Sequence, residues 1–191
     1  MRVCLAQHGP AAGPAVLADH LIIPAMDAIG QGWETGRISL AQVYLSGRLC
    51  EQLLEPYQPP AGARPAQPRL AIATLEDYHL LGKRLVLAAL RAGGYAVQDY
   101  GRQTAGALAA RAAAEGIEVL LISVLMLSSA LRVAEVRATL TALGCPARLV
   151  VGGAPFRLDR RLWRETGADA AGGSASDAVR LVQAYAEPRH D

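Results

Sequence analysis

An alternation of short apolar runs with helical patterns extends from residue 69 almost to the end of the chain, and it limits the fold more than any other feature. The apolar runs have the length and composition of buried strands, and the segments between them place apolar residues at helical spacing. Such alternation predicts a parallel sheet covered by helices on both faces. We expect strands at residues 69–75, 95–99, 118–124, 147–152 and 169–171, and helices at residues 80–92, 104–115, 128–143, 159–166 and 175–186.

The predicted fold class is therefore α/β, with a flavodoxin-like (Rossmann-like), doubly wound sheet of five parallel strands. In the flavodoxin-like strand order 2-1-3-4-5, strands one, three and four are neighbours. Ligands of such sheets bind in the crevice outside the carboxyl ends of the strands. We therefore expect the loops that follow these three strands to form one site.

A different pattern precedes the alternating region. Residues 15–29 and 39–55 place apolar side chains at helical spacing, so the segment 1–57 is predicted to be a short helical unit. Residues 58–68 are too rich in proline for a helix or a strand and are typical of a semi-rigid linker. The α/β domain is then predicted to occupy residues 69–191.

Composition excludes several classes of function. The chain is 52% hydrophobic, and its net charge of +2 comes without a basic run, which argues against nucleic-acid binding. No segment has about 18 uninterrupted apolar residues, so no membrane span is expected. The odd number and wide spacing of the cysteines predict neither a disulfide framework nor a zinc site and favour a reducing, cytoplasmic location; they are Cys4, Cys50 and Cys145.

Two titratable residues follow the first predicted strand. Asp77 and His79 lie on the loop that leaves its carboxyl end, and Gly82 follows at the start of the next predicted helix. A histidine that binds a metal usually donates its other ring proton to a carboxylate, which fixes the tautomer. The pattern is therefore typical of a metal ligand with its orienting carboxylate. The alternatives are a helix N-cap for Asp77 and a loop histidine without a ligand role for His79.

Three elements together give a family resemblance. Asp77-x-His79-x-x-Gly82 resembles the DxHxxG signature of cobalamin-binding domains, in which the histidine becomes the lower axial ligand of cobalt. Ser123-Val124-Leu125 resembles the SxL element of that family, and Gly152-Gly153 resembles its paired glycine. Their spacings are close to those of the methyltransferase-type members, and the resemblance covers roughly residues 16–186. It implies that cobalamin is the cofactor and that His79 binds its cobalt.

The resemblance also implies roles for other residues. Ser129 would complete a histidine–aspartate–serine relay with His79 and Asp77, or would simply cap a helix. Ser123 and Leu125 would contact the nucleotide tail of the cofactor, or would only end a strand.

Glycines are expected around the same tail. Gly152 and Gly153 would let it pass close to the backbone, which a Cβ would block, and the alternative is an ordinary turn. Gly172 and Gly173 would close the tail pocket, or would form a flexible turn before the last helix.

The N-terminal unit has a resemblance of its own. Residues 21–30, followed by Trp33-Glu34-x-Gly36-x-Ile38, are similar to the second half of the helical cap of corrinoid proteins. Trp33 would cover the upper face of the cobalt, although it could equally be part of the core of the cap. The first two helices of a four-helix cap have no counterpart here. We therefore expect two shortened caps to pair in a homodimer.

The function that the resemblance implies is that of a corrinoid protein without catalytic activity of its own. It would carry a methyl group on cobalt between partner methyltransferases, and a reductive activator would be a further partner. A cobalamin-dependent sensor or regulatory adaptor is the alternative, and the small subunit of a carbon-skeleton mutase is a third reading. The methyl donor and acceptor, the upper ligand and the oligomeric state stay open at this point.

Overall fold

A computed structural model of the 191-residue chain describes residues 67–186 continuously. Before them it describes residues 24–25, 28–29, 32, 35–39, 41–42, 45–47 and 49–50. The predicted cap helices and most of the predicted linker therefore lie largely outside the described residues. Within the described part of the chain, none of the helices combines the length and the hydropathy that crossing a bilayer requires.

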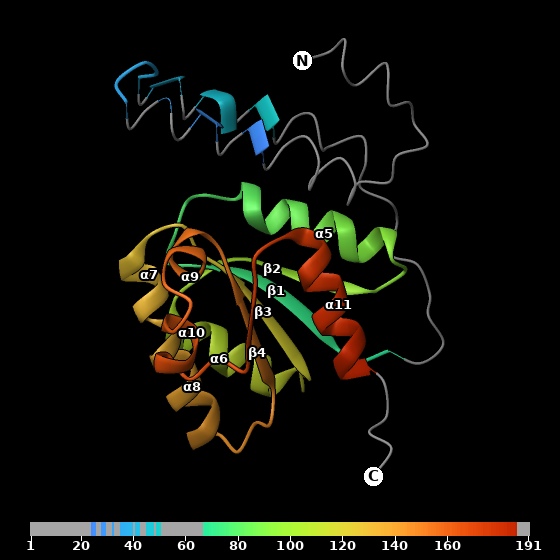
Figure 1. The fold of residues 1–191 in the computed structure, drawn as a ribbon. Coiled ribbons are helices and arrows are strands. Elements are labelled where there is room, and N and C mark those ends of the chain that lie inside the picture. Colours follow the sequence, from blue (N-terminus) through green and yellow to red (C-terminus); the bar gives the residue numbers. More distant parts are fainter. Residues whose placement is uncertain are drawn as a thin grey trace.

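Five strands form one parallel sheet in the order β2-β1-β3-β4-β5, as predicted (Figure 1). β1 lies between β2 and β3, so the loop that follows it lies beside the loop that follows β3. The carboxyl ends of the strands lie on the side of the sheet where the short helices gather (Figure 1). The strands are β1 Leu70–Leu75, β2 Val97–Gln103, β3 Val119–Ser123, β4 Arg148–Gly152 and β5 Ala170–Gly172.

Helices cover both faces of the sheet. One face carries α5 and α11, and the opposite face carries α6 and α8 (Figure 1). The bounds of the helices are α5 Leu81–Ala92, α6 Ala105–Ala114, α7 Leu127–Leu131, α8 Val133–Ala142, α9 Ala154–Leu158, α10 Leu162–Glu165 and α11 Ala175–Ala186.

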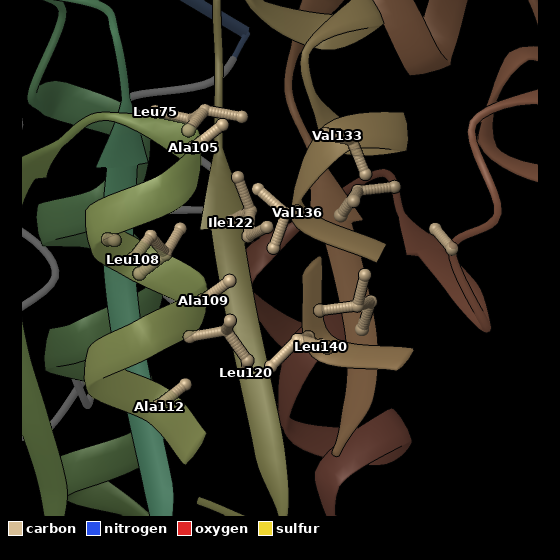
Figure 2. Packing of buried hydrophobic residues seen from close by; sticks show 14 of the residues in the cluster. Leu75, Ala105, Leu108, Ala109, Ala112, Leu120, Ile122, Val133, Val136 and Leu140 are labelled. Atoms are coloured by element: carbon tan, nitrogen blue, oxygen red, sulfur yellow. The ribbon is translucent and has the colours of Figure 1, made fainter. Parts of the chain in front are cut away.

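All six residues of β1 are buried, which explains its continuous apolar sequence. Alternate side chains enter two separate cores, so that Ala73 packs with α6 and α8 while Ile72 packs with α5 and α11. On the face that α6 and α8 cover, the small residues of α6 let this helix lie close to β1 and to α8. Figure 2 shows Ala109 of α6 directed toward the side chains of β3, and Ile122 of β3 next to Val136 of α8.

β2 begins later than predicted, at Val97 instead of residue 95. It is nevertheless longer than predicted, because it ends at Gln103 instead of residue 99. Its second half is polar and contains Gly101, whose φ is +68°. The pairing with β1 shifts register near this point, between Ile72 and Thr74. An edge strand tolerates such a bulge and exposed polar side chains, and these features hide the strand from an apolar pattern.

One predicted helix is divided in two, and another is replaced by two short helices, the first of which begins five residues earlier than predicted. The helix predicted at 128–143 is interrupted at Arg132, which separates α7 from α8. The helix predicted at 159–166 is instead α9, which starts directly after Gly153 with Pro155 in its first turn, followed by α10. Proline suits the first turn of a helix because its missing N–H has no intrahelical partner there. Asp159, with extended backbone, ends α9.

Candidate functional site

One row of small residues crosses the carboxyl end of the sheet. Thr74 of β1 pairs with Ser123 of β3, and Ser123 pairs with Gly152 of β4. Gly152 in turn pairs with Gly172 of β5. Side chains at paired positions point to the same face, and Thr74 shares its face with Ile72, which packs against α5 and α11. The row therefore faces these two helices, at the rim where the predicted site residues converge.

The Asp77 carboxylate joins the two central loops of this rim. Its Oδ2 accepts the backbone N–H groups of Leu125, at 2.7 Å, and of Met126, at 3.0 Å. Its Oδ1 accepts the backbone N–H of His79 at 3.0 Å and lies 2.6 Å from Nδ1 of the His79 ring. The side chain of Asp77 is 1% exposed. Asp77 is thus the clamp between the β1–α5 loop and the β3–α7 loop.

These contacts determine the protonation of the pair. Burial by itself opposes ionisation of Asp77, but hydrogen bonds from Leu125 N–H, the His79 ring, and the N–H groups of His79 and Met126 outweigh it and hold the pKa of Asp77 below its ordinary value. An ionised carboxylate can only accept, so Nδ1 of His79 donates to it. In the neutral ring the other nitrogen, Nε2, then carries the lone pair and is the atom able to bind a metal.

The His79 side chain is 50% exposed although Asp77 beneath it is buried. The ring is therefore held on one edge and open on the other. Among the residues that the structure describes, no group of three or more His, Cys, Asp or Glu side chains could hold a metal ion. A single imidazole suits a metal that brings most of its ligands with it, as a cobalt corrinoid does, and does not suit a bare ion.

Ser129 occupies a different position from the one predicted. Its Oγ donates to the backbone carbonyl of Glu76 at 3.3 Å and makes no hydrogen bond to Asp77. The reason is that both carboxylate oxygens of Asp77 already accept backbone N–H groups. The predicted histidine–aspartate–serine relay therefore lacks its second hydrogen bond in this structure. Ser129 still contributes to the site, because its bond anchors α7 to the residue that precedes Asp77.

Apolar side chains are exposed around the His79 ring. Their exposed fractions are 77% for Tyr78, 44% for Leu125, 52% for Met126 and 58% for Leu127. The guanidinium of Arg102 lies 4.0 Å from the centre of the Tyr78 ring. Leu125, predicted as a cofactor contact, thus presents its backbone to Asp77 and part of its side chain to solvent. A rim of this kind suits a large ligand with apolar faces.

Glycines permit close approach at three points of the site. A Cβ on Gly82 would lie 3.0 Å from Oγ of Ser123, and a Cβ on Gly152 would lie 3.2 Å from the carbonyl oxygen of Gly172. At Gly153, whose φ is +121°, a Cβ would lie 1.7 Å from the carbonyl oxygen of Val124. Residues with side chains would therefore fill the row or push the loops apart.

The β5–α11 loop is held by Asp177 in the first turn of α11. Its Oδ2 accepts the N–H of Gly173 at 3.0 Å, and its own N–H donates to Ser174 Oγ at 3.0 Å. Asp177 also forms an ion pair with Arg180. Hydrogen bonds therefore fix the turn that contains Gly172 and Gly173. The alternative of a flexible turn before the last helix does not describe it.

A buried polar atom tests whether this row fits a cofactor. The hydroxyl of Thr74 is fully buried and has no hydrogen-bond partner. Leaving a buried hydroxyl unpaired costs about 1–3 kcal/mol, so such groups usually serve a ligand or a bound water. Thr74 lies in the same row as Ser123 and Gly152, which the resemblance assigns to the nucleotide tail of cobalamin. The residues present therefore fit that group.

Some site residues were recognisable in the sequence and others were not. Trp33, predicted to cover the cobalt, lies outside the described residues. The spacing Ser174-x-x-Asp177 is that of a helix-capping box and would have identified Asp177. Thr74 could not be recognised as a site residue, because it is a single polar residue in an apolar run. Glu76, whose φ is +47°, had no signal at all, because positive φ in a glutamate cannot be inferred from its sequence.

Comparisons with known proteins match most of the chain. A family model described as the B12 binding domain matches residues 69–183, and a second model of the same description matches residues 4–55. Trimethylamine corrinoid protein 2 of Methanosarcina mazei is 29% identical over 191 residues, covering 94% of this chain and 86% of that protein.

Two solved structures are similar as well. The monomethylamine corrinoid protein of Methanosarcina barkeri has a TM-score of 0.69 and 27% identity, covering 94% of this chain and 86% of that chain. A chain of the methanol:cobalamin methyltransferase complex of the same organism shares the fold, with a TM-score of 0.56 and 24% identity, covering 96% of this chain and 70% of that one. Because the first model spans more than half of the chain and matches the segment that holds Asp77, His79, Ser123 and Gly152, this protein belongs to the B12 binding domain family.

Proposed function

We propose that this protein is a corrinoid carrier, which holds cobalamin through His79 and passes a methyl group between partner methyltransferases. The single observation that supports it most is the His79–Asp77 pair, in which a buried carboxylate fixes a half-exposed imidazole at the carboxyl rim of the sheet. A carboxylate in this position fixes the tautomer and the orientation of the ring and makes the imidazole a more basic ligand.

The remaining residues bind and orient the cofactor. Bound cobalamin supplies the cobalt on which a methyl group is accepted and released. Thr74 and Ser123 would offer hydroxyls to the nucleotide tail, and Gly82 and Gly152 would leave room for it. The exposed apolar side chains of Tyr78 and Leu125 would face the corrin ring.

The partners are inferred from the names of the relatives. The similar proteins are named for trimethylamine and monomethylamine, and one similar chain belongs to a complex with a methanol:cobalamin methyltransferase. A methyltransferase that demethylates a small amine or alcohol is therefore the partner class that we propose, together with a reductive activator. The proposed carrier would depend on these enzymes to activate the methyl donor and the methyl acceptor.

The cobalt ligand can be tested by spectroscopy. The protein is reconstituted with cobalamin, reduced to Co(II) and examined by electron paramagnetic resonance. We expect hyperfine coupling from one imidazole nitrogen, which His79→Ala should abolish. His190→Ala, which changes a histidine near the end of the chain, is the control and should leave the coupling unchanged. Coordination by the benzimidazole of the cofactor itself in the wild type would contradict the assignment.

The carrier role needs a second measurement. The reconstituted protein is mixed with a methylamine-specific methyltransferase and its amine, and methylation is followed by the visible absorption of the cobalt. A spectral change that requires both the enzyme and His79 would support methyl transfer. Binding of cobalamin with no methylation by any amine- or methanol-specific enzyme, together with a response to light, would favour a sensor instead.

A further inference from the structure

Glu76, which precedes the Asp77–His79 pair, forms contacts with four different parts of the fold. Its backbone N–H donates to the carbonyl of Gln103 at the end of β2, at 2.9 Å. Its own carbonyl accepts from Ser129 in α7. Its Oε1 accepts the N–H of Ala105 at the start of α6, at 3.1 Å. No other residue of the two central loops is held by so many separate elements in the described structure.

Arg132 provides the fourth contact, from the break between α7 and α8. Its Nε lies 3.3 Å from Oε2 of Glu76, and its Nη2 lies 3.4 Å from Oε1. The guanidinium therefore meets both oxygens of one carboxylate, the arrangement that fixes direction as well as distance. Arg132 lies at the turn between α7 and α8 and also pairs with Glu135 of α8, with 2.6 Å between Nη1 and Oε2.

The backbone of Glu76 is also unusual, since its φ is +47° and it is the only residue other than glycine with positive φ in the described part of the chain. Glycine adopts this conformation more easily. Glutamate in its place indicates that the side chain is needed. The turn at Glu76 directs Asp77 toward Leu125 and Met126, so its conformation determines where the clamp lies.

We infer that Glu76 and Arg132 form a positioning pair, which holds the β1–α5 loop against α7 so that the His79 ring is presented to the metal in one orientation. This inference rests on the proposed binding of cobalt by His79. The carboxylate of Asp77 joins the two loops from inside, and the Glu76–Arg132 pair joins them from the side of α6. Without the pair, Asp77 would still bond to the His79 ring, but the β1–α5 loop that carries both residues could change its orientation. The bond from the imidazole to cobalt would then be weaker, although the imidazole would still be present.

The test compares Glu76→Gln, Arg132→Gln and the double variant. Glutamine at position 76 keeps an oxygen for the N–H of Ala105 and loses only the charge that Arg132 requires. Glu118→Gln is the matched control, because Glu118 also accepts a backbone N–H, that of Arg69 at 2.8 Å, and faces the Arg69 side chain, but lies at the opposite end of β3. Circular dichroism and thermal melting establish that each variant is folded.

The measured quantity is the midpoint potential of the Co(II)/Co(I) couple of the reconstituted protein, followed by visible spectra. An imidazole that binds Co(II) more tightly than Co(I) would stabilise the oxidised form, so weaker binding by His79 would raise the potential. We expect each single variant to weaken imidazole binding about tenfold, which corresponds to a rise of about 59 mV for one electron. The double variant should match the single variants, because in the described structure Arg132 reaches the β1–α5 loop through Glu76, whereas its other ion pair, with Glu135, stays beside α8. Glu118→Gln should match the wild type.

The outcomes separate this inference from the proposed function. A wild-type Co(II) spectrum without imidazole coupling would overturn both. Imidazole coupling in the wild type, with potentials unchanged in Glu76→Gln and Arg132→Gln, would overturn the positioning role alone. Additive shifts in the double variant would also overturn it, since they would mean that the two residues act separately. Because Arg132 is half exposed, Arg132→Gln keeps the test valid if Glu76→Gln does not fold.

Discussion

Replacing Gly153 with alanine tests whether the close approach of the β3 and β4 ends depends on a residue without a Cβ. Gly153 has φ of +121° and ψ of 179°, a region of backbone space that is essentially restricted to glycine. The added Cβ would lie 1.7 Å from the carbonyl oxygen of Val124, which is backbone and cannot rotate away. Alanine can be accommodated only if one of the two loops moves.

The expected change in the free energy of unfolding of Gly153→Ala follows from two opposing effects. Holding a residue other than glycine in this region costs about 1–3 kcal/mol, and the overlap with the Val124 oxygen adds to that cost. Alanine restricts the unfolded chain, which offsets only about 0.4–1 kcal/mol. Because the overlap with the Val124 oxygen offsets the gain from the unfolded chain, we expect Gly153→Ala to lower the free energy of unfolding by about 3 kcal/mol, the upper end of the cost of the backbone conformation. For a chain of this size, that corresponds to a fall in Tm of about 6–12 °C.

Thermal and urea unfolding followed by circular dichroism measure this loss, with two glycines as controls. Gly144 has φ of +65° and nothing within 4 Å of its Cβ position, so Gly144→Ala should cost only about 1–2 kcal/mol. Gly106 lies inside α6 with open space around it, so Gly106→Ala should stabilise by up to about 1 kcal/mol. Equal melting temperatures for Gly153→Ala and Gly144→Ala would refute the contact with Val124.

Four further predictions concern the site and the oligomeric state. Asp77→Asn should keep cobalamin bound but weaken imidazole binding to cobalt about 10–100-fold; an unchanged Co(II)/Co(I) potential together with an unchanged methyl-transfer rate would argue against its role. Thr74→Val should raise the melting temperature of the cofactor-free protein, because it removes an unpaired buried hydroxyl, and should raise the Kd for cobalamin; equal Kd values would mean that the hydroxyl does not meet the tail. Although burial opposes it, hydrogen bonds from Gly173 N–H and Arg180 hold the pKa of Asp177 below its ordinary value, so the stability lost in Asp177→Asn should be full at pH 7 and shrink as the pH falls below about 4 through the folded pKa. Urea unfolding at pH 7 and pH 3 checks this, and a gap that does not change with pH would contradict it. Light scattering should show a homodimer formed through the shortened caps, and a monomeric mass with and without cobalamin would exclude self-pairing.

The sequence by itself determined the strand order and the place of the site. Both are consequences of patterns that are local in the chain, namely the apolar runs at β1, β3 and β4 and the residues directly after them. Asp77, His79 and Gly82 could be assigned to one loop because a buried strand and an amphipathic helix border them. Their convergence with Ser123 and Gly152 then followed from the neighbourhood of the strands in a parallel sheet.

Only the tertiary structure decided which groups bond to one another across that rim. The hydroxyl of Ser129 reaches the carbonyl of Glu76 and not the Asp77 carboxylate, because the N–H groups of Leu125 and Met126 already occupy it. The φ of Glu76 and its pairing with Arg132 likewise depend on residues 56 positions apart in the chain. No pattern within a single segment encodes such contacts, since each depends on where the sheet places the partner loop and on which acceptors are already taken.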